Sequence, residues 1–183
     1  MNETRSSLTI PDQGLTVISG GQSGVDRAAL DVAMQLAIPT AGWCPRGRRA
    51  EDGVIPGEYS LTETDSWNYA VRTERNVEDS DGTLVIVLNS VRGGTGLTVK
   101  LARQHNKPVH IVKLLDGCAS ACAEKKPTRH VQTVVDWMAT HKIRVLNVAG
   151  PRGSSDDRIY SLTSQFCREI LTAAVSATAE THR

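Results

Sequence analysis

The chain contains no run of apolar residues that approaches the ~20 needed to span a membrane as a helix. Its charges nearly cancel, with 21 Lys and Arg against 20 Asp and Glu, so neither a surface built to coat a polyanion nor an acidic tail is indicated. Residues 1–14 show neither the apolar core of a signal peptide nor an arginine-rich amphipathic pattern. We therefore expect a cytoplasmic protein whose partners include neither nucleic acid nor a membrane.

Cysteine is also scarce. The four cysteines are too widely spaced to resemble a disulfide scaffold: Cys44, Cys118, Cys122 and Cys167. Cys118 and Cys122 share a CxxxC spacing, but no second pair of Cys or His stands nearby, and structural zinc needs four ligands. We predict no protein-ligated metal and interpret these cysteines as small buried or loop residues.

Short apolar runs alternate with segments of helical periodicity along the 183 residues, a length suited to one domain. We expect that domain over residues 15–178, between flexible tails at 1–14 and 179–183. Strands are predicted at 15–19, 40–43, 83–88, 109–112 and 143–149, and helices at 25–36, 66–78, 96–105, 131–138 and from 157. This order predicts an α/β fold: a Rossmann-like open parallel sheet of about five strands with helices on both faces.

The first predicted strand runs directly into Gly20, Gly21, Gln22, Ser23 and Gly24. In parallel sheets ligands bind outside the carboxyl ends of the strands, where helix N-termini present free N–H groups. Because glycines let the backbone approach an anion closely, this loop is predicted to bind phosphate. The alternative is a plain tight turn in which Ser23 is the N-cap and Asp26 completes a capping box. Since a carboxylate repels phosphate, Asp26 is expected to cap backbone or to meet a ligand hydroxyl or amine.

A second glycine-rich junction follows the most apolar run, TLVIVL at 83–88. Three glycines in four residues exceed what a turn requires, so phosphate binding is predicted here too, by Gly93, Gly94, Thr95, Gly96 and Thr98. We expect Thr95 to cap the helix, which leaves the amides of residues 96–98 and the Thr98 hydroxyl available to an oxyanion.

A third junction, with Gly150, Arg152 and Ser154, adds an arginine that can bind phosphate with two hydrogen bonds. Asn147, in the preceding strand, either satisfies neighbouring backbone or reaches the site. The long polar segment after residue 43 carries Arg46, Arg48 and Arg49, which either close over an anionic ligand or form a solvated surface balanced by Glu51 and Asp52.

No arrangement of residues resembles a hydrolytic catalyst. The first loop lacks the terminal Lys-Ser/Thr pair of a Walker A loop. None of the histidines shares a motif with a nucleophile, and each is interpreted as structural or solvated: His105, His110, His130, His141 and His182.

The segments ISGGQSGVDRAALD, GWCPRGRRAEDGVIP, YAVRTERNVEDSDGTLVI, GGTGLT and LNVAGPRGS, in this order, resemble the molybdenum cofactor carrier protein family. That family is a Rossmann-like relative of the LOG-type phosphoribohydrolases, and the resemblance covers residues 15–175. It implies a carrier that binds molybdenum cofactor, a phosphate-bearing pterin whose own dithiolene holds the metal, and protects or delivers it. The expected partners are apo-molybdoenzymes or cofactor-biosynthesis proteins, and the expected state is a homo-oligomer, dimer or tetramer. The resemblance also marks five residues as ligand-facing or site-supporting: Arg46, Arg48, Arg72, Asn76 and Arg152.

The runner-up is a LOG-like nucleotide-binding protein or nucleoside monophosphate phosphoribohydrolase. LOG enzymes carry PGGxGTxxE, and aligning the glycines places Lys100 where their catalytic glutamate stands. A lysine cannot supply a carboxylate to a developing oxocarbenium ion, so we expect a protein that is not an enzyme. A third hypothesis is an interaction protein whose glycine loops are only turns.

Overall fold

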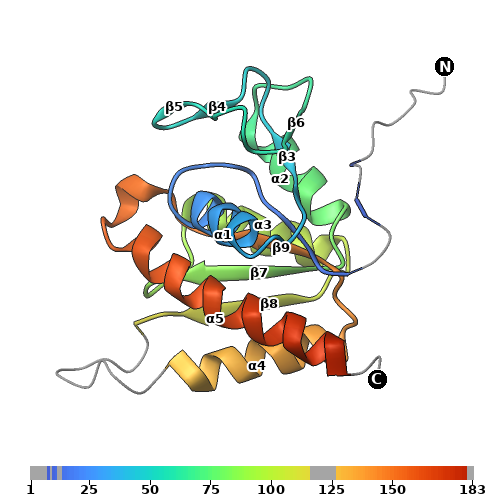
Figure 1. Ribbon diagram of the computed structural model, residues 1–183. Coiled ribbons are helices and arrows are strands. Elements are labelled where there is room, and N and C mark those ends of the chain that lie inside the picture. The colour runs from blue at the N-terminus through green and yellow to red at the C-terminus, as the bar shows by residue number, and fades with distance from the viewer. Residues whose placement is uncertain (1–7, 9, 12–13, 116–126, 181–183) are drawn as a thin grey trace.

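Five parallel strands form the central sheet in the order β2-β1-β9-β7-β8 (Figure 1). They are β1 (Thr16–Ile18), β2 (Thr40–Ala41), β7 (Gly82–Val87), β8 (Val109–Lys113) and β9 (Val145–Ala149). The computed structural model describes residues 8, 10, 11, 14–115 and 127–180. Cys118 and Cys122 lie outside these residues.

Helices cover both faces of the sheet (Figure 1). On one face α5 packs between α1 and α4, and on the other α2 packs against α3. Their bounds are α1 (Val25–Gln35), α2 (Tyr69–Glu78), α3 (Gly93–Gln104), α4 (Pro127–Thr140) and α5 (Ile159–Glu180). The predicted Rossmann-like α/β fold is therefore confirmed.

Strand β7 is the centre of the core, and all six of its residues are buried. Leu84 and Ile86 join the apolar cluster beneath α1, α4 and α5. Val85 and Val87 point to the opposite face and pack with Val99 of α3. This alternation explains why the run is apolar at every position, as the sequence predicts for a strand covered on both faces.

The predicted strand at 40–43 is divided by Gly42. Gly42 has a φ of +144°, and a Cβ there would lie 2.0 Å from the Ser19 carbonyl oxygen. The chain leaves the central sheet at this point, and β3 (Trp43–Cys44) pairs instead with β6 (Thr62–Glu63). The backbone contact between Gly42 and Ser19, the residue after β1, therefore sets where the long segment begins.

The segment between β3 and β6 is more ordered than its polar composition suggests. It contains an antiparallel hairpin of β4 (Arg49–Ala50) and β5 (Gly53–Val54), which projects beyond the carboxyl edge of the sheet (Figure 1). After β9, a short 3-10 turn, η1 (Gly153–Ser155), precedes α5. None of the helices in the described ranges is long and apolar enough to cross a membrane.

We expect Gly42→Ala to destabilise the fold by at least ~2 kcal/mol. The left-handed backbone conformation costs an L-residue about 1–3 kcal/mol, and the methyl group would overlap the Ser19 carbonyl as well. Urea denaturation measures the change. Gly57→Ala is the matched control, because a Cβ there meets no described atom within 4 Å; equal stability of the two variants would contradict the argument.

Candidate functional site

Three loops lie side by side at the carboxyl edge of the sheet, because the strands that precede them, β1, β9 and β7, are neighbours. They are the loop at 20–24, the loop at 150–155 and the start of α3. Helix α1 follows β1 on one face, whereas α3 follows β7 on the other. A crevice for a ligand is expected between helices that diverge in this way.

The first and third loops meet backbone to backbone. A Cβ on Gly24, whose φ is +81°, would lie 2.6 Å from the Gly153 nitrogen and 2.7 Å from the Pro151 oxygen. Gly24 is also the N-cap of α1, without a side-chain capping bond. The alternative in which Ser23 is the N-cap is therefore wrong: its hydroxyl accepts a hydrogen bond from the Gly153 amide at 3.0 Å instead.

Arg72 of α2 lies directly over Gly20. A Cβ on Gly20 would fall 1.7 Å from the Arg72 Nη1, so only glycine leaves room for the guanidinium. Nη1 also lies 3.3 Å from Oδ2 of Asp26. Nε of Arg72 is buried and has no hydrogen-bond partner among the described residues. An unsatisfied cationic donor beside a glycine-rich backbone is suited to an anionic ligand.

Asp26 is 3 % exposed. Burial raises the pKa of its carboxyl above the usual range, although Arg72 and the Gln22 amide, which donates to it at 3.3 Å, both act to lower the pKa. The prediction that Asp26 caps backbone is confirmed by the Gln22 contact. The capping box is not formed, since Ser23 is not the N-cap.

Glu51 is a functional-site residue that sequence reasoning missed. The β4–β5 hairpin carries its carboxylate to the third loop, where it accepts hydrogen bonds from the Ser154 amide at 2.9 Å and the Ser154 hydroxyl at 2.6 Å. The Ser23 hydroxyl donates to it as well, and Nε of Arg152 lies 3.4 Å away. The protein's own carboxylate thus occupies the donors that the sequence assigned to a ligand phosphate.

The surroundings of Glu51 favour its charged form. Burial raises the pKa of its carboxyl, but the hydrogen bonds from Ser154 and Ser23 outweigh burial and hold the pKa below the usual range. Gln22 joins the same network, because its Oε1 accepts hydrogen bonds from the backbone amides of Glu51 at 2.8 Å and Ser23 at 3.1 Å.

Asp52, next in the chain, binds Arg27 through both carboxylate oxygens. Of the two alternatives for Arg46, Arg48 and Arg49, the one in which Glu51 and Asp52 balance them is therefore wrong, because these carboxylates bind the third loop and Arg27.

Helix α3 begins at Gly93, three residues earlier than predicted, and Arg92 holds the N-cap position. The Gly96 amide donates to the Arg92 carbonyl, so the amides at the open helix end are those of Gly93, Gly94 and Thr95. Thr95 is buried in the first turn and is not the cap. The Thr98 hydroxyl donates to the Gly94 carbonyl at 3.2 Å, so its proton is not directed to a ligand.

The space around this helix end is open. A Cβ on Gly93 or Gly94 would meet no described atom within 4 Å. An anion at this edge therefore has both free backbone donors and room, which the third loop, filled by Glu51, does not offer.

Arg48 and Asn76 support the site rather than face a ligand. The Arg48 guanidinium donates to four carbonyl oxygens at 2.8–3.0 Å, those of Ile55, Pro56, Tyr59 and Leu61. Asn76 is buried and binds the backbone of Trp43 through both ends of its amide, at 2.8 and 2.9 Å. Asn147 likewise turns inward and donates to the Thr83 hydroxyl at 3.1 Å.

Arg46 belongs to an exposed patch. Its guanidinium and that of Arg49 each lie 5.8 Å from the ring centroid of Trp67, which is 60 % exposed. The apolar periodicity of residues 66–78 suggested that Trp67 lies on a packed helical face, but α2 begins only at Tyr69.

The order and geometry of these loops agree with one known family. The chain matches the family described as "Circularly permutated YpsA SLOG family" over residues 17–171, from β1 into α5. The chain belongs to this SLOG family. A crystal structure from Syntrophus aciditrophicus SB, named "Putative molybdenum carrier protein", is 40% identical, has a TM-score of 0.80 and is matched over 86% of this chain and 95% of that one. No curated protein matches the chain.

Glu51→Gln tests the internal carboxylate of this SLOG domain. We expect the variant to be less stable at neutral pH by ~1–2 kcal/mol, because its charge-assisted hydrogen bonds are weakened. The folded-state pKa of Glu51 lies below its usual value of 4.5. The stabilisation is therefore complete above pH 4.5 and is lost as pH falls through the folded-state pKa.

Urea denaturation of the wild type and Glu51→Gln between pH 7 and pH 3 measures this difference. Glu58→Gln, at an exposed glutamate of the same segment, is the control and should track the wild type. A stability gap that stays constant across this pH range would contradict the assignment.

Proposed function

We propose that this protein binds molybdenum cofactor, protects it, and delivers it to apo-molybdoenzymes or to proteins of cofactor biosynthesis. The name of the 40% identical neighbour supports molybdenum cofactor as the cargo. The observation that supports an anionic ligand is the position of Arg72: its Nη1 lies over Gly20 at the carboxyl edge of the sheet, and its Nε has no hydrogen-bond partner among the described residues. The homo-oligomeric state implied by the family resemblance stays a prediction.

The three glycine junctions have different parts in this proposal. Glu51 fills the donors of the third loop, whereas a Cβ on Gly93 or Gly94, at the start of α3, would meet no described atom within 4 Å. We therefore assign the cofactor's phosphate to the start of α3, and a further anionic or carbonyl group of the ligand to Arg72 and the first loop. Helix N-termini stabilise anions by their free N–H groups and dipole.

The metal of the cargo would be held by the cofactor's own dithiolene. Cys44 and Cys167 are both buried. Burial raises the pKa of both thiols, that of Cys167 to about 12, which disfavours the thiolate form that binds metals. These cysteines fit a protein that holds a cofactor without ligating its metal.

We propose binding rather than catalysis. Lys100, which aligns with the catalytic glutamate of LOG enzymes, lies exposed on α3 between the buried Val99 and Leu101. Asp26 and Glu51 bring carboxylates to the crevice, but Asp26 pairs with Arg72 and Glu51 is enclosed by hydrogen-bond donors. Each carboxylate therefore already has partners within the protein.

Cofactor protection and transfer test the proposal. Purified protein should lengthen the half-life of added molybdenum cofactor and should reconstitute an apo-molybdoenzyme. The same protein incubated with nucleoside monophosphates should release no free base. Absence of both protection and binding would overturn the proposal, and release of free base would favour the LOG-type alternative.

Gly94→Ala separates the ligand site from the fold. Alanine suits the first turn of α3 and meets no described atom, so we expect unchanged stability or a gain of up to ~1 kcal/mol. We expect cofactor affinity to fall at least tenfold, because the methyl group projects into the space assigned to the phosphate. Calorimetric titration and thermal denaturation measure the two effects, with Gly57→Ala as control. Unchanged affinity would place the phosphate elsewhere.

A further inference from the structure

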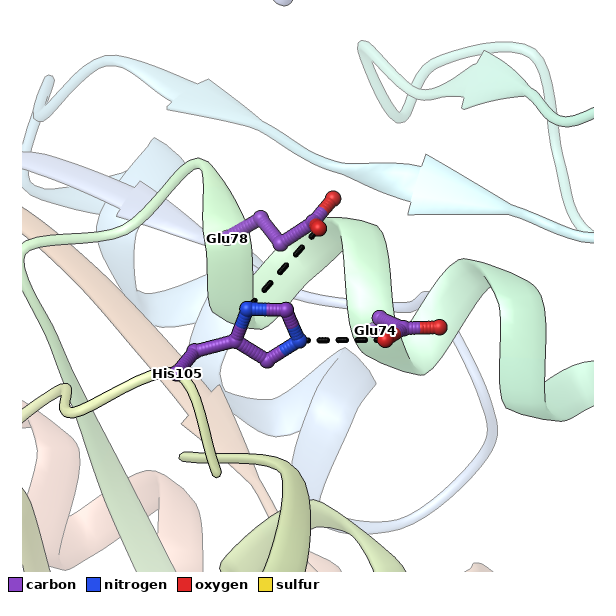
Figure 2. A group of neighbouring side chains, drawn as sticks. All are labelled: Glu74, Glu78 and His105. Carbon is purple, nitrogen blue, oxygen red and sulfur yellow. Dashed lines mark hydrogen bonds and ion pairs between the residues drawn. The ribbon is translucent and has the colours of Figure 1, made fainter. Parts of the chain in front are cut away.

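A second polar cluster lies where the C-terminal half of α2 meets the end of α3 (Figure 2). Glu74 and Glu78 stand one turn apart on α2 and both face His105, the C-cap residue of α3. In a parallel α/β sheet the helices run opposite to the strands, so helix C-termini lie away from the strands' carboxyl edge. The cluster is therefore separate from the glycine loops.

The three side chains are close and partly buried. His105 Nε2 lies 3.0 Å from Glu74 Oε1, and Nδ1 lies 3.8 Å from Glu78 Oε1 (Figure 2). One ligand atom from each residue can be chosen so that all lie within 4.8 Å of one another. The side chains of His105, Glu74 and Glu78 are 28 %, 47 % and 21 % exposed, so water has access to the cluster.

The cluster combines one imidazole ring with two carboxylates. A neutral imidazole has one N–H donor and one lone pair, so it cannot donate to two carboxylates at once. Two carboxylates facing one neutral ring carry a charge of −2 between them. A divalent ion at this position would stand beside both carboxylates and the ring.

The geometry suits the ion. Metal bonds to imidazole nitrogen and carboxylate oxygen are about 2.0–2.2 Å long, so neighbouring ligands on one ion stand roughly 3 Å apart. His105 Nε2 and Glu74 Oε1 already have this separation, whereas Glu78 Oε1 lies nearer Nδ1 and must move closer to Nε2 to become the third ligand. One imidazole and two carboxylates without a thiolate suit Zn²⁺, Co²⁺ or Mn²⁺, with water at the remaining positions.

We propose that Glu74, Glu78 and His105 bind one divalent transition-metal ion that joins α2 to α3. This site is independent of the proposed cofactor cargo. The role of the ion is structural. It adds a second link between α2 and α3, which already pack through Val77, Leu101 and Ala102. Helix α2 also presents Arg72 to Gly20, so an ion that fixes this helix fixes the cation of the ligand site.

Calorimetric titration of Zn²⁺ into the metal-free, full-length protein tests the proposal. Because Cys118 and Cys122 offer a competing pair of thiols, the titration is made in the wild type and in a C118S/C122S variant. We expect a Zn²⁺ ion to bind in both, and His105→Gln in the C118S/C122S background to weaken its binding at least tenfold. His141→Gln, at an exposed histidine on another part of the surface, is the control and should leave the affinity unchanged.

Two further measurements test whether the bound ion is held by Glu74, Glu78 and His105. Zn²⁺ should raise the melting temperature of C118S/C122S and not that of its His105→Gln derivative, and Co²⁺ bound to C118S/C122S should show a visible spectrum of N/O ligation. If His105→Gln fails to fold, Glu74→Gln and Glu78→Gln take its place. No binding to C118S/C122S, or binding that survives loss of His105 or of the glutamates, overturns the proposal.

Discussion

Close approach of backbone to backbone at the carboxyl edge of the sheet is the constraint on which the site depends. Gly42 lies against Ser19, Gly24 against Gly153, and Gly150 against the Ile86 carbonyl, where a Cβ would fall 2.3 Å from the oxygen. No side chain larger than hydrogen fits at these contacts. They bring the ends of β1, β9 and β7 close enough for polar groups from distant segments to share partners.

Glu51 shows the result of that closeness. Its carboxylate accepts hydrogen bonds from the Ser154 amide, the Ser154 hydroxyl and the Ser23 hydroxyl, and hydrogen bonds to a charged group are stronger than those between neutral groups. The hairpin that carries Glu51 is therefore held to the third loop by groups that would otherwise need another anion. Loops with the same glycine-rich composition consequently differ in structure: an internal carboxylate binds the third loop, and the start of α3 is open.

The features that the sequence predicts well are those that depend on neighbouring residues. The apolar run of β7, the helical stripe of α1 and the order of strands and helices each reflect local periodicity, and together they define the sheet. Glycines just after the predicted strands also indicated the three loops at the carboxyl edge of the sheet. Membership of the SLOG family agrees with the resemblance seen in the order of these segments.

The features that the sequence does not predict depend on partners far along the chain. Ser23 looks like an N-cap until Glu51 and Gly153, 28 and 130 residues away, engage its hydroxyl. Arg48 looks like an anion ligand, but its guanidinium binds carbonyls of residues 55–61. Trp67 fits a helical period that the chain does not adopt there. In each case a tertiary contact replaced the local preference.

The position of β9 has a consequence for how this chain folds. β9 is the last strand in sequence but the central one in the sheet, and it joins β1, 129 residues earlier, to β7. Until β9 leaves the ribosome, the β1–β2 and β7–β8 pairs each keep an unpaired inner edge. Exposed strand edges invite pairing with other chains, and contacts between distant residues form slowly. The nascent chain is thus most prone to aggregation in the interval before β9 emerges.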